Sequence, residues 1–229
     1  MPNYIALKNV SQSFQSNDTK ITLFDNLNLS LHQGASYAIT GPSGSGKSSL
    51  LMLASGLEQP TTGNCYYLES KRKRSLNDLR ADIGFIFQQF HLLPELNALN
   101  NVALPLKLRS DKQALNKATS WLNKVGLGDR LTHKPSELSG GEQQRVAIAR
   151  ALVFNPKFIF ADEPTGNLDQ NSANEVAGIL IKCCQENNAG LIIVTHSDLL
   201  ASRAQKIYSL TNGELISVDQ KDSGVTYAN

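Results

Sequence analysis

Hydrophobic and polar residues alternate along two stretches near the start of the chain, residues 5–10 and 21–31. Alternation with a period of two places every second side chain on one face of a sheet, so both stretches are predicted to be antiparallel strands. Short apolar runs predict further strands along the rest of the chain, at residues 37–40, 64–68, 83–87, 157–161 and 191–195. The polar residues 69–80, with four consecutive cations at Lys71–Arg74, are expected to form a solvated loop rather than a membrane-surface patch.

A helical spacing of leucine and alanine replaces this alternation in the middle of the chain. Helices are predicted over residues 48–57, 99–108, 113–125, 141–154 and 171–186, separated by proline and glycine. The last of these lies between two apolar strands, as a right-handed parallel crossover requires. Asn212-Gly213 joins two final strand patterns, 206–211 and 214–218, and is a two-residue hairpin signal.

Strands that alternate with helices predict an α/β fold with a parallel-sheet core, an N-terminal antiparallel β subdomain and an inserted helical subdomain. We expect one domain over residues 1–229. Its core takes residues 1–88 and 157–218, its helical subdomain takes 89–156, and residues 219–229 form a polar tail that we expect to be flexible.

Composition narrows the class of protein. The 229 residues are 41% hydrophobic and 18% charged, as in a globular chain, and the net charge of +2 is too small to argue for nucleic-acid binding. No apolar stretch approaches the length of a membrane helix, and the N-terminus lacks a signal-peptide pattern, so we expect a cytosolic protein. Cys65, Cys183 and Cys184 show no CxxC spacing and are expected to be reduced, packed thiols.

The strongest chemical signal is GPSGSGKS at residues 41–48, which matches GxxxxGK[ST] after a predicted strand and before a predicted helix. Backbone N–H groups of Gly44–Ser48 at the helix N-terminus would wrap phosphate oxygens. Lys47 would reach the β and γ phosphates, and the Ser48 hydroxyl would bind Mg²⁺. The motif predicts a phosphate-loop NTPase core of the RecA/F1-like type.

Polar residues follow three of the predicted apolar strands. Asp162 and Glu163 follow one, where Asp162 would hold Mg²⁺ and Glu163 would polarise the attacking water. Gln88 ends another and is a candidate for Mg²⁺ or water, with Gln89 as the rival candidate. His196 ends a third and could contact the γ phosphate, although a structural histidine is an equal alternative.

Residues 138–143, LSGGEQ, precede a predicted helix with Ser139 as its expected N-cap. Two glycines there would let the backbone approach an anion at a second helix N-terminus. In isolation the segment is better interpreted as an ordinary capped helix.

These motifs occur together and in one order: the phosphate loop, Gln88, LSGGEQQR at 138–145, FIFADEPTGNLD at 158–169 and VTHS at 194–197. The chain thereby resembles the ATPases of ATP-binding cassette (ABC) transporters over about residues 5–218, and LSGGEQQR is the most specific element. Residues 85–106 and ADEPTGNLD are similar to the branch that includes lipoprotein-releasing (LolD-type) and macrolide-export (MacB-type) ATPases.

The resemblance implies a role for each matching residue. It gives catalytic roles to Glu163, His196 and Gln88, and metal binding to Ser48, Gln88 and Asp162. Phe14 falls where the family has an aromatic residue that stacks on adenine, with a core-facing phenylalanine as the alternative. The resemblance also implies a set of residues that bind ATP. They are Phe14, Gly41, Ser43, Gly44, Ser45, Gly46, Lys47, Ser48, Ser49, Ser139, Gly140, Gly141, Glu142 and Asp169.

The resemblance also implies the assembly. Two ATP molecules would be sandwiched in a head-to-tail homodimer, each between residues 41–48 of one subunit and 139–141 of the other. A separate transmembrane permease would take up the motion, contacted through residues 88–101, and would hold this chain at the inner face of the cell membrane. The alternatives are a soluble ABC ATPase that remodels a ribosome or DNA complex, and a regulatory module that binds ATP without turnover. Intact Glu163 and His196 argue against the latter.

Overall fold

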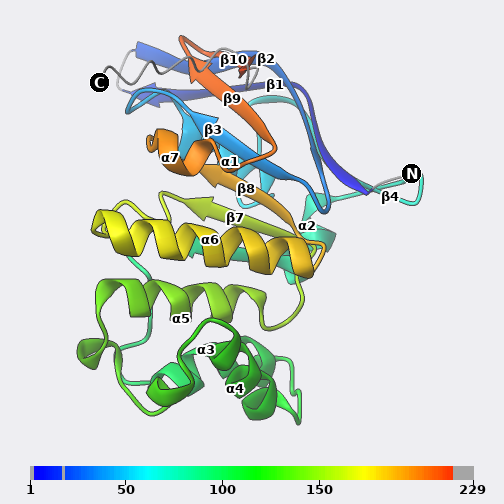
Figure 1. Ribbon diagram of the computed structural model, residues 1–229. Coiled ribbons are helices and arrows are strands. Elements are labelled where there is room, and N and C mark those ends of the chain that lie inside the picture. The colour runs from blue at the N-terminus through cyan, green and yellow to red at the C-terminus, as the bar shows by residue number, and fades with distance from the viewer. Residues whose placement is uncertain (1–2, 17–18, 219–229) are drawn as a thin grey trace, which may run out of the picture. The chain divides into compact units, whose positions relative to one another are not determined.

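The computed structural model describes residues 3–16 and 19–218 (Figure 1). The tail predicted at residues 219–229 lies outside this range. The chain divides into two compact units. The first holds residues 1–32, 36–78 and 192–229, and the second holds residues 33–35 and 79–191.

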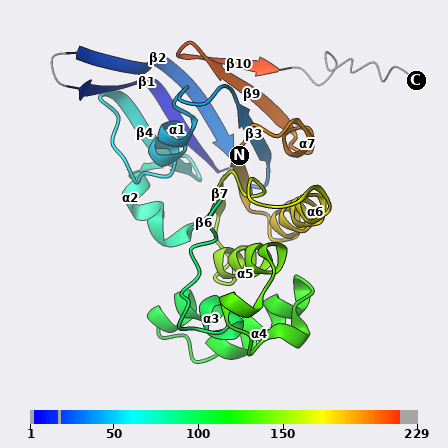
Figure 2. The ribbon, with the colours of Figure 1, turned by 90° about the vertical axis from the view of Figure 1, so that its left-hand side faces the viewer.

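An antiparallel sheet opens the first unit, as the alternating patterns predict. Its strands lie in the order β2-β1-β4-β5. Their bounds are β1 (Tyr4–Ser16), β2 (Thr19–His32), β4 (Thr62–Glu69) and β5 (Arg72–Arg74). The first two strands are longer than predicted because register shifts near Val10 and Gln12 let the pairing continue past the point where alternation breaks. Figure 2 shows the long β1–β2 pair and the helix α1 (Lys47–Ala54) beside the sheet.

The expected loop over residues 69–80 is wrong in part. Arg72–Arg74 pairs antiparallel with β4 as strand β5, after a turn in which Ser70 and Lys71 adopt positive φ angles of 48° and 71°. Leu76–Leu79 forms the short helix α2. The four cations of Lys71–Arg74 are nevertheless exposed, as predicted, and charged side chains of this kind are typical of an edge strand.

A second set of strands, which lies in the first unit except for the first two residues of β8, contains a parallel pair and carries the phosphate loop. Its order is β10-β9-β3-β8, with β3 parallel to β9 and β9 antiparallel to β10. The bounds are β3 (Ser36–Thr40), β8 (Gly190–Val194), β9 (Lys206–Thr211) and β10 (Glu214–Val218), and the short helix α7 (Asp198–Ala201) packs near β3. Asn212 and Gly213 have φ angles of 51° and 81°, which confirms the predicted hairpin turn.

The second unit combines two parallel strands with the helical region. The strands are β6 (Ile83–Phe87) and β7 (Phe158–Asp162). The helices are α3 (Ala98–Leu108), α4 (Ala114–Lys124), α5 (Gly140–Leu152) and α6 (Gln170–Glu186), with single 3₁₀ turns at Arg80–Asp82, Gly128–Arg130 and Pro135–Glu137. Figure 1 shows α5 and α6 side by side, with α3 and α4 on the other side of α5.

Helix α5 and strand β6 approach one another closely. A Cβ atom at Gly84 would lie 2.5 Å from the carbonyl oxygen of Ala151, so only glycine fits at this point of β6. Val146, Ile148 and Leu152 of α5 are fully buried. Among residues 3–16 and 19–218, no helix is long and apolar enough to cross a bilayer.

Candidate active site

The phosphate loop occupies the predicted place between β3 and α1. Gly44 and Gly46 have φ angles of 78° and 95°, which residues with a side chain rarely adopt. Gly46 is the N-cap of α1. Gly41 needs its lack of a side chain for a second reason, because a Cβ atom there would lie 2.2 Å from the carbonyl oxygen of Leu210. These three glycines fold the loop back over the helix N-terminus.

The Lys47 ammonium lies inside this loop. It donates hydrogen bonds to the carbonyl oxygens of Gly41 at 2.9 Å and Pro42 at 2.8 Å. The Ser45 hydroxyl is buried and has no hydrogen-bond partner among the described residues, while Ser48 is exposed. A cation, an unpaired hydroxyl and a helix N-terminus at one place are the groups that bind phosphate oxygens.

Strand β7 ends at the predicted carboxylates. Asp162 is its last residue, and Glu163 follows with a φ angle of 47°, in the left-handed region that a glutamate seldom adopts. The Gly166 N–H donates to the Glu163 carbonyl oxygen at 3.0 Å, which closes a tight turn. The chain therefore turns away from the sheet directly after Asp162, and both carboxylates are half-buried.

The β6–β7 register brings Gln88 to the same edge as the carboxylates. Phe87 lies opposite Asp162, so Gln88, the residue that follows β6, leaves the sheet beside Glu163. The Gln88 side chain donates from Nε2 to Oδ1 of Asn167 at 2.8 Å, and Asn167 donates from Nδ2 to the Gln88 carbonyl oxygen at 3.0 Å. Gln89, the rival candidate, is exposed.

The segment LSGGEQ forms a capped helix N-terminus in the second unit. The Ser139 hydroxyl accepts the Glu142 N–H, and the Glu142 carboxylate accepts the Ser139 N–H at 2.8 Å and pairs with Arg130. These contacts, the Ser139 N–H first, hold the pKa of Glu142 below its usual value. The cap expected at Ser139 is confirmed.

The N-termini of α5 and α6 lie together. Cβ atoms at Gly140 and Gly141 would lie 3.3 Å from Leu168 and Ser172, so the two glycines allow this close approach. Asp169 is the N-cap of α6 and accepts the N–H groups of Asn171 and Ser172, each at 3.1 Å. Hydrogen bonds from Ser172 lower the pKa of the Asp169 carboxyl.

The remaining predicted residues lie in the first unit. Phe14 is 45% exposed opposite Ile21, which is 49% exposed, so the core-facing alternative for Phe14 is wrong. His196 follows β8 and is exposed. The first unit thus holds Phe14, the phosphate loop and His196, whereas the second brings together Gln88, the two carboxylates, the LSGGEQ helix end and Asp169.

The structure adds polar residues that the sequence did not single out. Gln144 is fully buried and donates to the carbonyl oxygens of Pro164 at 2.6 Å and Phe87 at 3.4 Å, which ties α5 to the ends of both strands. Asn167 holds Gln88, and Arg150 donates to the carbonyl oxygens that follow Gln89. Gln144 and Asn167 lie inside motifs, yet their partners are 20 to 79 residues away in the sequence.

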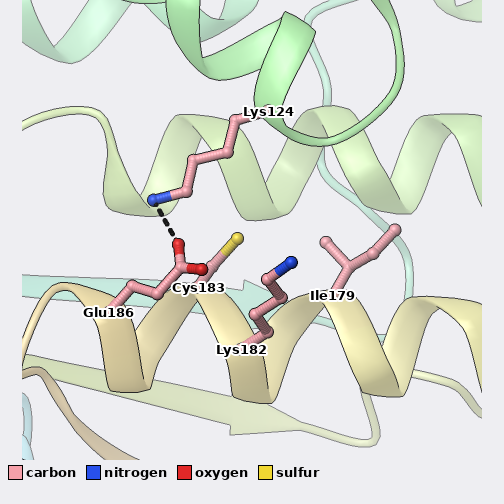
Figure 3. Close-up of a pocket in the computed structure, with 5 residues that line it drawn as sticks. All are labelled: Lys124, Ile179, Lys182, Cys183 and Glu186. Carbon is pink, nitrogen blue, oxygen red and sulfur yellow. Dashed lines mark ion pairs between the residues drawn. The ribbon is translucent and has the colours of Figure 1, made fainter.

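A small cavity of about 160 Å³ lies apart from all predicted site residues. Figure 3 shows that it is lined by α4 and α6, through Lys124, Ile179, Lys182, Cys183 and Glu186. Lys124 and Glu186 form an ion pair at 2.9 Å across it. Burial raises the pKa of the Cys183 thiol.

Comparison with known proteins agrees with this geometry. The profile of the ABC transporter family matches residues 24–166. The chain is 44% identical over 213 residues to the lipoprotein-releasing system ATP-binding protein LolD of Rickettsia bellii. The aligned residues cover 92% of this chain and 96% of that protein. It is 43% identical to the macrolide export ATP-binding/permease protein MacB of Bdellovibrio bacteriovorus, of which it spans 33%.

Solved structures show the same fold. The dimeric post-hydrolysis structure of the ATP-binding cassette MJ0796, bound to ADP and Pi, has a TM-score of 0.79 and 38% sequence identity over 92% of this chain and 96% of that one. This likeness confirms the predicted cassette fold, with its parallel-sheet core, antiparallel β subdomain and helical insert. The chain belongs to the ABC transporter family, as an ATP-binding subunit and ATPase of the LolD and MacB type.

Proposed function

We propose that this chain binds ATP through Phe14 and residues 41–49, and hydrolyses it with Glu163 as the residue that polarises water. Lys47 would bind the β and γ phosphates, and His196 would contact the γ phosphate. The observation that carries this proposal is the phosphate loop, in which the Lys47 ammonium and the buried, unpaired Ser45 hydroxyl lie at the N-terminus of α1.

Magnesium fits the donor set that the chain offers. Ser48, Gln88 and Asp162 supply a hydroxyl, an amide oxygen and a carboxylate, which are hard oxygen ligands of the kind that Mg²⁺ prefers. When bound, the ion would neutralise the charge that develops on the phosphate oxygens. The chain's own residues would orient the nucleotide and accept the proton of the attacking water.

A head-to-tail homodimer would complete the site. Ser139, Gly140 and Gly141 form a second capped helix N-terminus, which can bind an anion of the partner subunit's nucleotide. Asp169 caps the neighbouring helix α6 and would lie at the same contact. The dimeric state reported for the MJ0796 cassette supports this assembly.

The similar proteins suggest the task that ATP serves. LolD is named for lipoprotein release and MacB for macrolide export, and the latter joins its ATP-binding part to a permease. We place this chain in an export or lipoprotein-release transporter, held at the inner face of the cell membrane by separate transmembrane subunits. ATP-driven dimer closure would do mechanical work on those subunits.

Light scattering coupled to size-exclusion chromatography of Glu163→Gln tests the proposal. With MgATP we expect its mass to double, because the phosphate cradle remains while the water-polarising carboxylate is lost. Glu58→Gln, an exposed residue outside the site, is the matched control and should turn over ATP like the wild type without accumulating as a dimer. Normal turnover by Glu163→Gln would overturn the assignment of Glu163, and a ribosome or DNA complex in place of co-purifying membrane subunits would overturn the transporter task.

A further inference from the structure

Gln88 and Asn167 are joined by two hydrogen bonds that run in opposite directions. Asn167 Nδ2 donates to the backbone carbonyl oxygen of Gln88 at 3.0 Å, and Gln88 Nε2 donates to Asn167 Oδ1 at 2.8 Å. The two residues are 79 positions apart in the sequence, and both belong to the second unit. The pair forms a closed ring of polar contacts at the edge where β6 and β7 end.

This ring determines the orientation of the Gln88 amide, that is, whether Nε2 or Oε1 faces Asn167. A backbone carbonyl oxygen can only accept a hydrogen bond, so Asn167 must turn its NH₂ group toward it. Its Oδ1 atom then faces the Gln88 side chain, and Gln88 must present its own NH₂ group to that oxygen. Oε1 of Gln88 is thereby directed away from Asn167, and among the described residues it accepts no hydrogen bond.

Gly166 provides the space for this arrangement. A Cβ atom at residue 166 would lie 2.9 Å from Nε2 of Gln88 and 3.2 Å from its Cδ atom. Gly166 does not have a positive φ angle, so its backbone would accept alanine without strain. The glycine is therefore explained by the Gln88 side chain that lies against it.

We propose that Asn167 is a positioning residue that fixes the amide of Gln88 with its oxygen available for Mg²⁺, and that Gly166 makes room for that orientation. The inference rests on the proposed function, in which Gln88 binds the metal. Without Asn167, either the oxygen or the NH₂ group of Gln88 could face the ion, and the NH₂ group cannot bind a cation. Without this hydrogen bond the ion itself must order the Gln88 side chain, which costs about 1 kcal/mol and should weaken Mg²⁺ binding by about fivefold.

The test measures metal binding without turnover. In a Glu163→Gln background, the fluorescence of a labelled ATP analogue is followed as Mg²⁺ is added, and again in EDTA. For Asn167→Ala and Gly166→Ala we expect the Mg²⁺ midpoint to rise about fivefold, with unchanged affinity in EDTA. Asn116→Ala, on the exposed face of α4, is the matched control and should not move the midpoint.

A double-mutant cycle separates positioning from a structural role. If Asn167 acts through Gln88, then Asn167→Ala adds nothing in a Gln88→Ala background, although it shifts the midpoint on its own. Full additivity, or a midpoint unchanged by Asn167→Ala and Gly166→Ala, would overturn the inference. An unchanged midpoint in Gln88→Ala would overturn the metal role of Gln88 and the inference with it. Failure of the wild type to bind the analogue would instead contradict the proposed function itself.

Discussion

Arg150 donates a hydrogen bond from Nη1 to the carbonyl oxygen of His91, with 2.6 Å between the two atoms. Its Nη2 atom donates to the Phe90 carbonyl oxygen at 2.9 Å. Phe90 and His91 have φ angles of 54° and 47°, so two consecutive residues with side chains adopt the left-handed conformation. The last turn of α5 therefore holds the strained segment that follows Gln88 and Gln89.

Replacing Arg150 should release this segment. Arg150→Ala removes two hydrogen bonds from a charged donor, and we expect the free energy of unfolding to fall by about 2 kcal/mol. Arg150→Lys should recover only part of the loss, because an ammonium group lacks the planar fork that reaches both carbonyl oxygens. Urea denaturation measures the change, with Arg72→Ala on the exposed edge strand β5 as the control. Equal losses in Arg150→Ala and Arg72→Ala would contradict the role of Arg150.

The capping box of α5 should make stability depend on pH. Its hydrogen bonds lower the pKa of Glu142 in the folded state, so its charge stabilises the fold above the unfolded pKa and ceases to do so as pH falls through the folded value. Glu142→Gln keeps the shape but loses the charge and should cost about 0.5 kcal/mol at pH 7. This difference should shrink as pH falls below about 4. Urea denaturation at several pH values would refute the idea if the difference stayed constant.

Lys47 should matter both for the nucleotide and for the loop that holds it. In Lys47→Ala the cation that would pair with the β and γ phosphates is lost, and so are its bonds to Gly41 and Pro42. We expect ATP affinity to fall by at least about tenfold. Fluorescence titration with a labelled ATP analogue measures it, and tight binding by the variant would count against the phosphate loop as the nucleotide site. Lys112→Ala, at an exposed position, is the control.

The three cysteines should react slowly with thiol reagents. Burial raises the pKa of Cys65 to about 11, and burial also raises the pKa values of Cys183 and Cys184. At pH 8 the Cys65 thiolate should be on the order of a hundredfold scarcer than in a free cysteine, and its labelling rate should rise with pH. The fully buried Cys184 should react only after unfolding. Rapid labelling of all three thiols by DTNB at pH 8 would contradict this packing.

Periodicity and motifs were sufficient to predict most of the fold. Strands β9 and β10 have the predicted bounds, and the helices α3 to α6 begin and end within two residues of prediction. The turn at Asn212-Gly213 and the cap at Ser139 were predictable because both depend on adjacent residues. The strand β5 was missed because its sequence, Arg72–Arg74, has no apolar side chain and pairs only as an edge.

The contacts that orient the candidate site were not predictable in the same way. Asn167 and Gln144 each lie inside a recognisable motif, but nothing in a motif tells which backbone carbonyl will lie within reach. Arg150 lies in a predicted helix, and a helical pattern does not indicate the partners of its side chain. The hydrogen-bond partners of these residues depend on the register of β6 against β7 and on the position of α5, which belong to the tertiary structure.

At Gly84, strand β6 and helix α5 meet backbone to backbone, so a single methyl group there is enough to push the helix away. Gln88 stands at the end of that strand, and Ser139 stands at the start of that helix. A Gly84→Ala variant would keep the full sequence of both motifs but change the distance between the end of β6 and the start of α5. The relative position of the two motifs thus depends on Gly84, a residue that belongs to neither motif.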